Sequence, residues 1–199
     1  MGRITELTLV RTGTANIKEQ IETLIWAGKR NAEAIVLECM ALRPEYQSLC
    51  EREIIQAHIA IITNIRADHL DVMGPEVEDV GWALAGMIPK DGVLISAEHN
   101  YYLLLEEACR IKNAKLLLVN RDDVNAISDQ MMTQFSHLEH KENVAIALKI
   151  AEYYGISNSE AWQAMISAQP DPGALVALSM LSRDTKRIHL EFCKCFCRQ

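Results

Sequence analysis

The stretch "AIITNIRADHLDVMGP", residues 60–75, begins as an apolar run and then turns abruptly polar. Residues 59–63, "IAIIT", are short and uniformly apolar, which predicts a strand buried on both faces. Directly behind that strand the chain places Asn64, Asp68, His69 and Asp71. Ligands of open parallel sheets gather beyond the carboxyl ends of the strands. The stretch therefore predicts both a strand and a functional turn.

The same alternation of short apolar runs and longer amphipathic stretches continues along the chain. Further strands are predicted at 34–38 ("AIVLE"), 93–96 ("VLIS") and 115–119 ("KLLLV"). Helices are predicted between and after them, at residues 16–29, 75–87, 100–112, 140–154 and 158–168. We expect Pro75 in a first helical turn and Gly155 in a left-handed C-cap. This rhythm predicts an α/β fold, a mostly parallel sheet with crossover helices.

Composition narrows the function class. The 199 residues suffice for one core, with 49% hydrophobic and 24% charged residues. The net charge of −7 argues against nucleic acid as a partner. No apolar run approaches the ~20 residues of a membrane span, and the first residues lack the apolar core of a signal peptide. We therefore expect a cytoplasmic protein.

The six cysteines fall into two groups. Cys39, Cys50 and Cys109 lie among apolar neighbours, which predicts buried, reduced thiols. The other three crowd into the last seven residues, at Cys193, Cys195 and Cys197. Their C-x-C-x-C spacing has no second pair, so it does not predict a metal site.

Two positions at predicted strand ends are candidate ligands. Glu38 closes the run 34–38, where a buried carboxylate needs a cation: a divalent metal, an arginine, or else a surface position. His69 can bind a metal through one nitrogen while a neighbour fixes its tautomer. The alternative is that Asp68 or Asp71 caps a following turn and His69 lies at the surface. The residues alone leave both interpretations open.

Three longer segments carry a family resemblance: "NAEAIVLECMALRPEYQSLCE" (31–51), "TNIRADHLDVMGP" (63–75) and "HKENVAIAL" (140–148). They resemble the ligase subunit of bacterial poly-γ-glutamate synthase, the CapB or PgsB type, within the Mur ligase superfamily of ATP-dependent amide-forming enzymes. The similarity spans residues 10 to 175. It implies that the chain is an incomplete central domain of the Mur ligase type. The fold of such a domain resembles that of P-loop NTPases.

The resemblance also implies a reaction. ATP phosphorylates a glutamyl γ-carboxylate to an acyl phosphate, an incoming amino group displaces phosphate, and Mg²⁺ neutralises the phosphate oxygens. By motif position, Glu38 and His69 become the metal ligands and, with Asp68, the expected catalytic residues. Asn64 and Asp68 are expected to order the loop.

Three further positions are expected to bind the nucleotide or face the active site. His140 and Asn143 match the motif that meets adenine, although they could equally be the N-cap and first turn of a helix. Asn16, in "TANIKEQ", matches a loop that faces the active site. The implied partners are glutamate, the growing poly-γ-glutamate chain and small membrane subunits, at the inner face of the bacterial plasma membrane.

The chain departs from the family at both ends. No glycine-rich loop of the type "TGTxGKS" occurs, and "RTGTAN" (11–16) lacks the lysine and hydroxyl that follow it in such loops. We therefore expect residues 1–173 to be a partial ATP-binding domain without its first strand, loop and helix. We expect residues 174–199 to be an aberrant, frameshifted tail, because "CKCFCRQ" read in a shifted frame can give the family-like "VNAFAAN".

Two rival functions remain. Another Mur-type ligase, acting on folylpolyglutamate or peptidoglycan peptides, is disfavoured by the narrower marks "ECMAL" (38–42) and "PDPGAL" (170–175). A non-catalytic remnant is favoured by the missing phosphate loop. A sheet without one strand also exposes an edge, so we expect marginal stability or aggregation and little activity from this chain itself.

Overall fold

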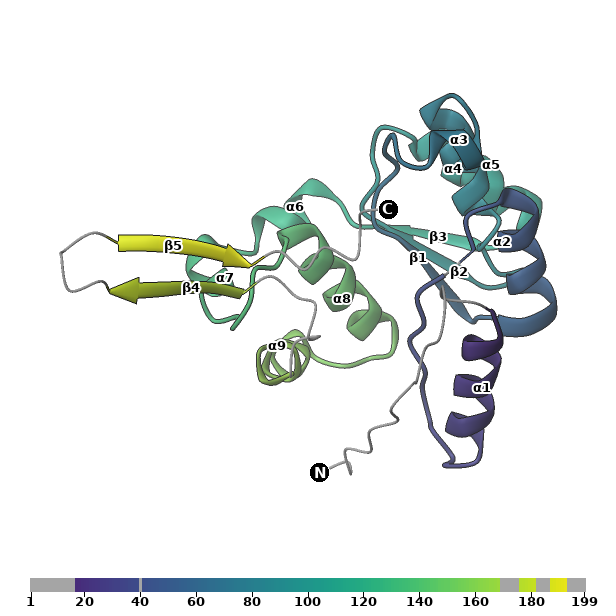
Figure 1. The fold of residues 1–199 in the computed structure, drawn as a ribbon. Helices are drawn as coiled ribbons and strands as arrows, with labels where there is room; N and C mark the ends of the chain where they lie inside the picture. Colours follow the sequence, from purple (N-terminus) through teal and green to yellow (C-terminus); the bar gives the residue numbers. More distant parts are fainter. Residues whose placement is uncertain (1–16, 40, 169–175, 182–186, 193–199) are drawn as a thin grey trace. The chain divides into compact units, whose positions relative to one another are not determined.

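The computed structural model describes residues 17–39, 41–168, 176–181 and 187–192. Its central feature is a three-stranded parallel sheet of order β1-β2-β3, formed by Ile59–Ile62, Val93–Ser96 and Lys115–Leu118 (Figure 1). The strands predicted at 59–63, 93–96 and 115–119 are thereby confirmed. A separate antiparallel pair follows, β4 (Val176–Leu181) and β5 (Arg187–Phe192).

Burial follows the position of each strand in the sheet. All four residues of the middle strand β2 are buried, and Leu94 and Ile95 are fully inaccessible. In β1, Ala60 and Ile62 are buried but Ile61 is 43% exposed. The same burial on both faces was expected for all three strands. It is confirmed for β2 and wrong for β1 and for β3, where Lys115 is exposed and the other three residues are only half-buried. β1 and β3 are the outer strands of this described sheet, so less of the structure covers them.

The predicted helices are confirmed. They are α1 (Ile17–Gly28), α4 (Val77–Ala85), α5 (Tyr102–Lys112), α8 (Lys141–Tyr153) and α9 (Asn158–Ser167). Shorter elements were not predicted: α2 (Pro44–Cys50), the π-helix η1 (Glu51–Ile55), α3 (Leu70–Met73), α6 (Arg121–Asn125) and α7 (Asp129–Met132). Each has at most seven residues, too few for an apolar period to repeat.

Two local predictions had different outcomes. Gly155 has φ of +74°, as expected for a left-handed residue just after α8. Pro75 does not lie in the first turn of α4, because Glu76 is the N-cap and the helix begins at Val77. The Asp79 carboxylate accepts a hydrogen bond from the Glu76 backbone N–H at 3.0 Å, and this bond sets the start of the helix two residues later than predicted.

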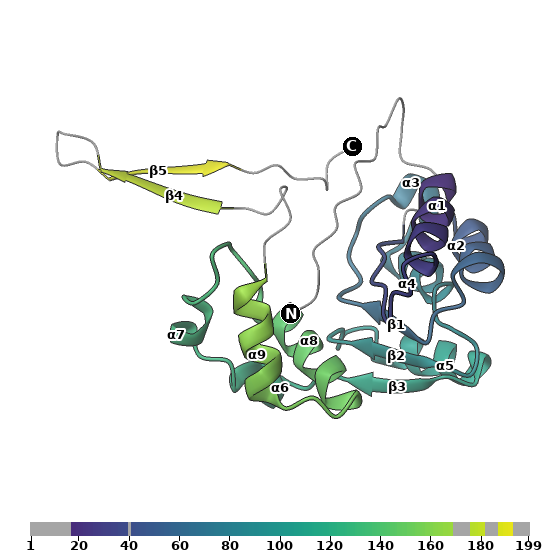
Figure 2. The ribbon, with the colours of Figure 1, turned by 90° about the horizontal axis from the view of Figure 1, so that it is seen from below.

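The described chain divides into two compact units. The first comprises Met1–Ala60, Ile65–Val93 and Leu103–Lys115, and the second Ile61–Asn64, Leu94–Tyr102 and Leu116–Gln199. In the first unit α4 packs closely, since a Cβ on Gly81 would come within 2.9 Å of the Leu104 side chain. In the second unit α8 contacts α6 and α9, as both views show (Figures 1 and 2).

The prediction of a buried strand at residues 34–38 was wrong. These residues form no strand, and Ile35 and Val36 are 41% and 89% exposed. The segment runs beside α1 in Figure 1, and the Gln20 side-chain amide donates to the Glu38 backbone carbonyl at 2.6 Å. Its apolar composition is that of a strand, but among the described residues no strand pairs with it. The result is an exposed apolar segment.

The predictions about the tail and the phosphate-loop region are largely outside the described residues. Asn16, the segment "PDPGAL" from 170 to 175, and Cys193, Cys195 and Cys197 all lie there. Within the stretch expected to be an aberrant tail, β4 and β5 pair from Val176 opposite Phe192 to Leu181 opposite Arg187. The β4 stretch "VALSML" is rich in aliphatic residues, and the β5 stretch "RIHLEF" alternates polar and apolar residues; both patterns suit strands.

The three remaining cysteines are free thiols, as predicted. Cys50 and Cys109 are buried and Cys39 is half-buried. Burial raises the pKa of the Cys109 thiol to about 11, and it is also the main reason why the pKa values of Cys39 and Cys50 are raised.

Among the described residues no helix is long and apolar enough to cross a membrane.

One buried carboxylate stands out in the first unit. Glu51 is 4% exposed, and one of its oxygens accepts a hydrogen bond from the Ala57 backbone N–H at 2.9 Å, while the other oxygen has no partner. Burial raises the Glu51 pKa above its ordinary value, against smaller opposing effects of that hydrogen bond and of Lys112. The folded state therefore binds a proton at Glu51 more tightly than the unfolded chain does.

Because its pKa is raised, ionised Glu51 lowers the free energy of unfolding at higher pH, and Glu51→Gln should remove this loss. The favourable contribution of protonated Glu51 is complete below its unfolded pKa of about 4.3 and is lost as pH rises through its folded pKa. Urea unfolding at pH 4 and pH 7 should therefore show the variant gaining free energy of unfolding, relative to wild type, at the higher pH. Glu53→Gln, an exposed control on the same helix, should show no such gain. An equal offset at both pH values would contradict the burial of a charge at Glu51.

Candidate functional site

The turn after β1 presents the residues that the sequence singled out. Asn64 is exposed, and its side-chain amide donates to the Thr63 hydroxyl at 3.3 Å. Asp68 and His69 follow immediately before the short helix α3. His69 adopts the left-handed conformation, with φ of 49° and ψ of 37°. A left-handed residue other than glycine costs free energy and is concentrated at functional sites, so this backbone marks the turn.

The structure brings Asp68 and His69 together. The His69 Nε2 atom lies 3.7 Å from the Asp68 Oδ1 atom, and their side chains are 31% and 72% exposed. A carboxylate on one ring nitrogen fixes the tautomer of the imidazole and leaves the other nitrogen as a potential ligand. At 3.7 Å the two groups are too far apart for a hydrogen bond, so the described geometry is a proximity of charges between two adjacent residues.

Helix capping does not explain the acids in this turn. The N-cap position of α3 is His69 itself, and no side chain makes a capping hydrogen bond there. Asp71 lies within the first turn of α3, and Asp68 precedes the N-cap. The alternative that Asp68 or Asp71 caps the turn was therefore wrong, although the imidazole of His69 is partly exposed as that alternative expected.

Glu38 offers an uncommitted carboxylate. It lies at the end of the segment 34–38 and is exposed, so the surface position left open by the sequence is confirmed and the carboxylate is not buried. Its backbone carbonyl accepts a hydrogen bond from Gln20, and its charge contributes to the raised pKa of the Cys39 thiol. Glu38 and His69 belong to the same compact unit. They form no direct ion pair among those found in the described part of the chain.

A metal bound by the predicted ligands would need further ligands from outside the described residues. No group of three or more histidine, cysteine or acidic side chains that could enclose a metal occurs among the described residues. Mg²⁺ is normally held by one or two carboxylates together with water and substrate phosphates rather than by a complete protein cage. Of the two predicted ligands, the exposed Glu38 carboxylate is the oxygen type that Mg²⁺ prefers, whereas His69 would add a nitrogen.

The end of β2 contains a polar cluster that the sequence did not reveal. The Ser96 hydroxyl donates to the Ile62 carbonyl at 2.6 Å and accepts from the Glu98 backbone N–H at 3.1 Å. Buried Glu98 then accepts from the backbone N–H groups of Asn100 and Tyr101 at 2.6 and 3.4 Å. The cluster joins the ends of β1 and β2 and orders the turn before α5.

The other predicted group lies at the start of α8, in the second unit. His140 is the N-cap residue, with no side-chain capping bond, and Asn143 lies in the first turn, so the local arrangement left open as an alternative is confirmed. The Asn143 amide donates to the Glu139 carboxylate at 2.9 Å. Glu139 was missed, although its position four residues before Asn143 is a spacing at which helical side chains meet.

A pocket elsewhere in the second unit contains none of the predicted site residues. It has a volume of about 370 Å³ and lies among α6, α7, α8 and α9, with Ile127, Leu148 and Trp162 in its apolar part. Its charged residues are Asp123, Lys149 and Glu152, and the lysine is paired with both acids. This net negative lining does not favour an anionic ligand.

The left-handed backbone of His69 makes a prediction about stability. A residue with a side chain lowers the free energy of unfolding by about 1–2 kcal/mol when its backbone is left-handed, and His69→Gly removes this strain. Glycine in turn lowers the free energy of unfolding by about 0.5–1 kcal/mol, because it makes the unfolded chain more flexible. We expect urea unfolding to show no loss of stability for His69→Gly. Asp68→Gly, at a neighbouring residue without positive φ, should lose about 0.5–1 kcal/mol. Equal losses for the two variants would contradict the described turn.

Two curated proteins are similar to this chain over most of its length. The chain is 35% identical over 167 residues to PGA synthase CapB of Bacillus subtilis (strain 168), a match covering 84% of this chain and 42% of the relative. It is 36% identical over 160 residues to the capsule biosynthesis protein CapB of Bacillus anthracis, covering 80% of this chain and 34% of that protein. The chain thus spans less than half the length of either relative. No family model matches the sequence.

A solved structure supports the fold. Escherichia coli FolC in complex with DHPP and ADP superimposes with a TM-score of 0.51 and 22% identity, over 63% of this chain and 33% of FolC. This likeness concerns the fold, which agrees with the predicted Mur ligase type. Together with the two sequence matches and the motifs at Glu38, His69 and Asn143, it leads to one conclusion: the chain belongs to the CapB family.

Proposed function

We propose that this chain carries part of an ATP-dependent carbon–nitrogen ligase that polymerises glutamate through its γ-carboxylate. The observation that carries the proposal is the 35% identity, over 84% of this chain, to a protein named PGA synthase. The Asp68–His69 turn and Glu38, which lie in the same compact unit, are the residues to which we assign the metal. Poly-γ-glutamate is the polymer that this function makes.

The reaction proceeds in two steps. An oxygen of the γ-carboxylate attacks the terminal phosphorus of ATP, which forms an acyl phosphate and releases ADP. The amino nitrogen of the next glutamate then attacks the acyl carbon, loses a proton and expels inorganic phosphate, so that an amide remains. The protein's contribution to such chemistry is positioning and the neutralisation of negative charge.

In this proposal Glu38 and His69 hold one Mg²⁺ ion. The ion supplies charge neutralisation at phosphate oxygens when it is bound. Asp68 contributes by orienting the His69 imidazole, which its carboxylate approaches at 3.7 Å. Asn64, at the end of β1, orders the loop that carries both residues.

His140 and Asn143 are the proposed contacts to the adenine base. Both are exposed residues at the amino terminus of α8. The likeness to FolC supports the choice of nucleotide, since that protein is described with ADP. Asn16 is proposed to lie in a loop facing the active site.

The partners follow from the same function. Glutamate and the growing poly-γ-glutamate chain are the proposed substrates, and small membrane subunits are the proposed partners. The proposed location is the inner face of the bacterial plasma membrane.

A non-catalytic remnant is the second candidate. The chain has no glycine-rich loop with the lysine and hydroxyl pair that neutralise a triphosphate in ligases of this type. Direct binding measurements on the whole chain distinguish the two candidates.

We predict that Glu38→Gln and His69→Ala each weaken Mg²⁺-dependent ATP binding by about tenfold or more, because each removes one metal ligand. Isothermal titration calorimetry of the full chain, with Mg²⁺ and with EDTA, measures this. Glu33→Gln, in the segment before Glu38, and His99→Ala, an exposed histidine after β2, are the matched controls and should bind like wild type.

The other outcomes are equally informative. Glutamate-dependent release of inorganic phosphate would support the ligase directly. Wild-type protein without Mg²⁺-dependent ATP binding would favour the remnant. Binding that survives both Glu38→Gln and His69→Ala would remove the metal assignment while leaving nucleotide binding intact.

A further inference from the structure

A single carboxylate organises the segment before α8. One oxygen of Glu139, Oε1, accepts hydrogen bonds at 2.9 Å from both the His140 backbone N–H and the Asn143 side-chain amide. The other oxygen, Oε2, lies 3.5 Å from Nε2 of His137. Glu139 thus joins three neighbouring residues at the point where α8 begins.

The surroundings hold this carboxylate in place. The side chains of Glu139 and His137 are only 26% and 15% exposed. The His137 ring packs edge-on against Phe135, which packs edge-on against Trp162 of α9, with ring centroids 5.9 and 5.5 Å apart. This aromatic contact ties the segment to the buried part of the second unit.

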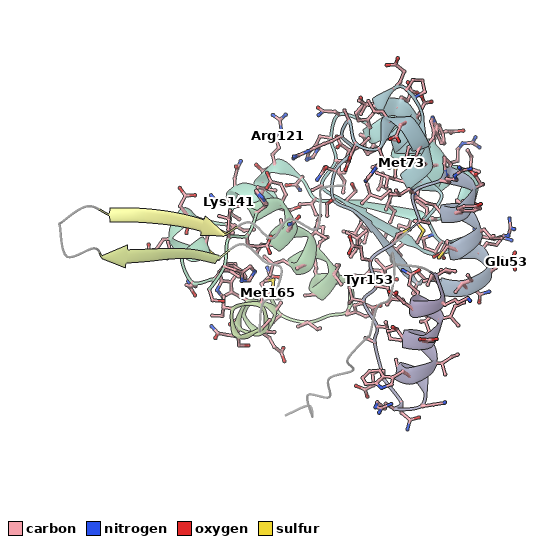
Figure 3. The ribbon with its side chains drawn as sticks, in the orientation of Figure 1. Glu53, Met73, Arg121, Lys141, Tyr153 and Met165 are labelled. Carbon is pink, nitrogen blue, oxygen red and sulfur yellow. The ribbon has the colours of Figure 1, made fainter. Side chains whose placement is uncertain are left out.

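An ion pair fastens the other side of the segment. The Lys141 Nζ atom lies 2.6 Å from the Asp129 Oδ1 atom, which joins the first residue of α8 to α7. Lys141 is labelled in Figure 3, where it marks the start of α8. The residues between α7 and α8, Glu139 among them, are therefore held at both ends.

The chemistry of the pair fixes the orientation of the Asn143 amide. An ionised carboxylate has no proton to donate, so only the amide nitrogen of asparagine can face it. Nδ2 of Asn143 must therefore point to Glu139, and Oδ1 must lie at the opposite side of the amide group. Asn143 is exposed, and the hydrogen bond described for its side chain is made by Nδ2, so Oδ1 remains an acceptor that a ligand can reach.

A fixed acceptor discriminates between purine bases. Adenine carries an amino donor at position 6, whereas guanine carries an oxygen acceptor there. Hypoxanthine, the base of ITP, has the same oxygen. An Asn143 amide with its oxygen outward accepts from the adenine amino group and opposes the oxygen of the other two bases. A freely rotating amide could turn its oxygen toward adenine or its nitrogen toward a 6-oxopurine, and would therefore bind both kinds of base.

We propose that Glu139 is a positioning residue that makes this nucleotide site selective for adenine over 6-oxopurines. The inference rests on the proposed function, in which Asn143 contacts the base. It adds a residue that the sequence motif does not contain and a specificity that the motif alone does not explain. Glu139 acts through Asn143 and touches no reacting atom.

The test compares ATP with ITP. Affinities of the full chain for both nucleotides with Mg²⁺ are measured by calorimetry for wild type, Glu139→Ala and the milder Glu139→Gln. Glu139→Ala should reduce the preference for ATP by about fivefold to tenfold, the range for one hydrogen bond, and Glu139→Gln by less. Glu142→Ala removes an exposed acid from the same turn and should leave the preference unchanged.

A second readout needs no nucleotide. The Asn143 side-chain NH₂ signals in a ¹H–¹⁵N spectrum should shift in Glu139→Ala and stay in place in Glu142→Ala. Unchanged Asn143 signals in Glu139→Ala would overturn the inference, whatever the nucleotide affinities of the two variants.

Asn143→Ala separates the two levels of the proposal. If this variant loses the ATP preference but Glu139→Ala keeps it, the base contact stands and the role of Glu139 is overturned. If Asn143→Ala keeps the preference, or wild type binds no adenine nucleotide, the base site fails and the role of Glu139 fails with it.

Discussion

The burial of β2 is the constraint on which the rest of the sheet depends. Its four residues are all buried, and its last residue, Ser96, donates a hydrogen bond to the Ile62 carbonyl of β1 at 2.6 Å. That bond joins the carboxyl ends of two strands, where a parallel sheet places its ligands. The turn beginning at Asn64 and the turn around Glu98 therefore leave the sheet from linked positions. The chemistry proposed for this chain begins at that edge.

Local pattern was sufficient for most of the fold. The runs at 59–63, 93–96 and 115–119 became strands, and the amphipathic stretches became helices, because apolar period and length are both written in the sequence. Burial was harder, since it depends on neighbours that a local pattern does not contain. The segment 34–38 has the composition of a buried strand, yet it forms no strand and Val36 is 89% exposed. Exposed apolar backbone of this kind favours association.

In the candidate site, too, the sequence predicted the positions of residues but not their contacts. Motif positions identified Glu38, His69 and Asn143, but not the contacts that give those residues their properties. The left-handed backbone of His69 and the position of its ring beside Asp68 are results of packing. Glu139 could have been found from its spacing to Asn143, whereas its approach to His137 could not, because the loop before α8 has no repeating pattern to read.

The central functional claim is that Glu38 and His69 share one metal ion. Paramagnetic Mn²⁺, which replaces Mg²⁺ at oxygen-rich sites, broadens the NMR signals of nearby nuclei. In ¹H–¹⁵N spectra of the full chain with ATP, we expect the backbone signals of Glu38 and His69 to broaden together at the same low Mn²⁺ concentration, and those of Glu33 and His99 to stay sharp. Broadening of only one member of the pair, or of all four residues alike, would contradict a shared ion.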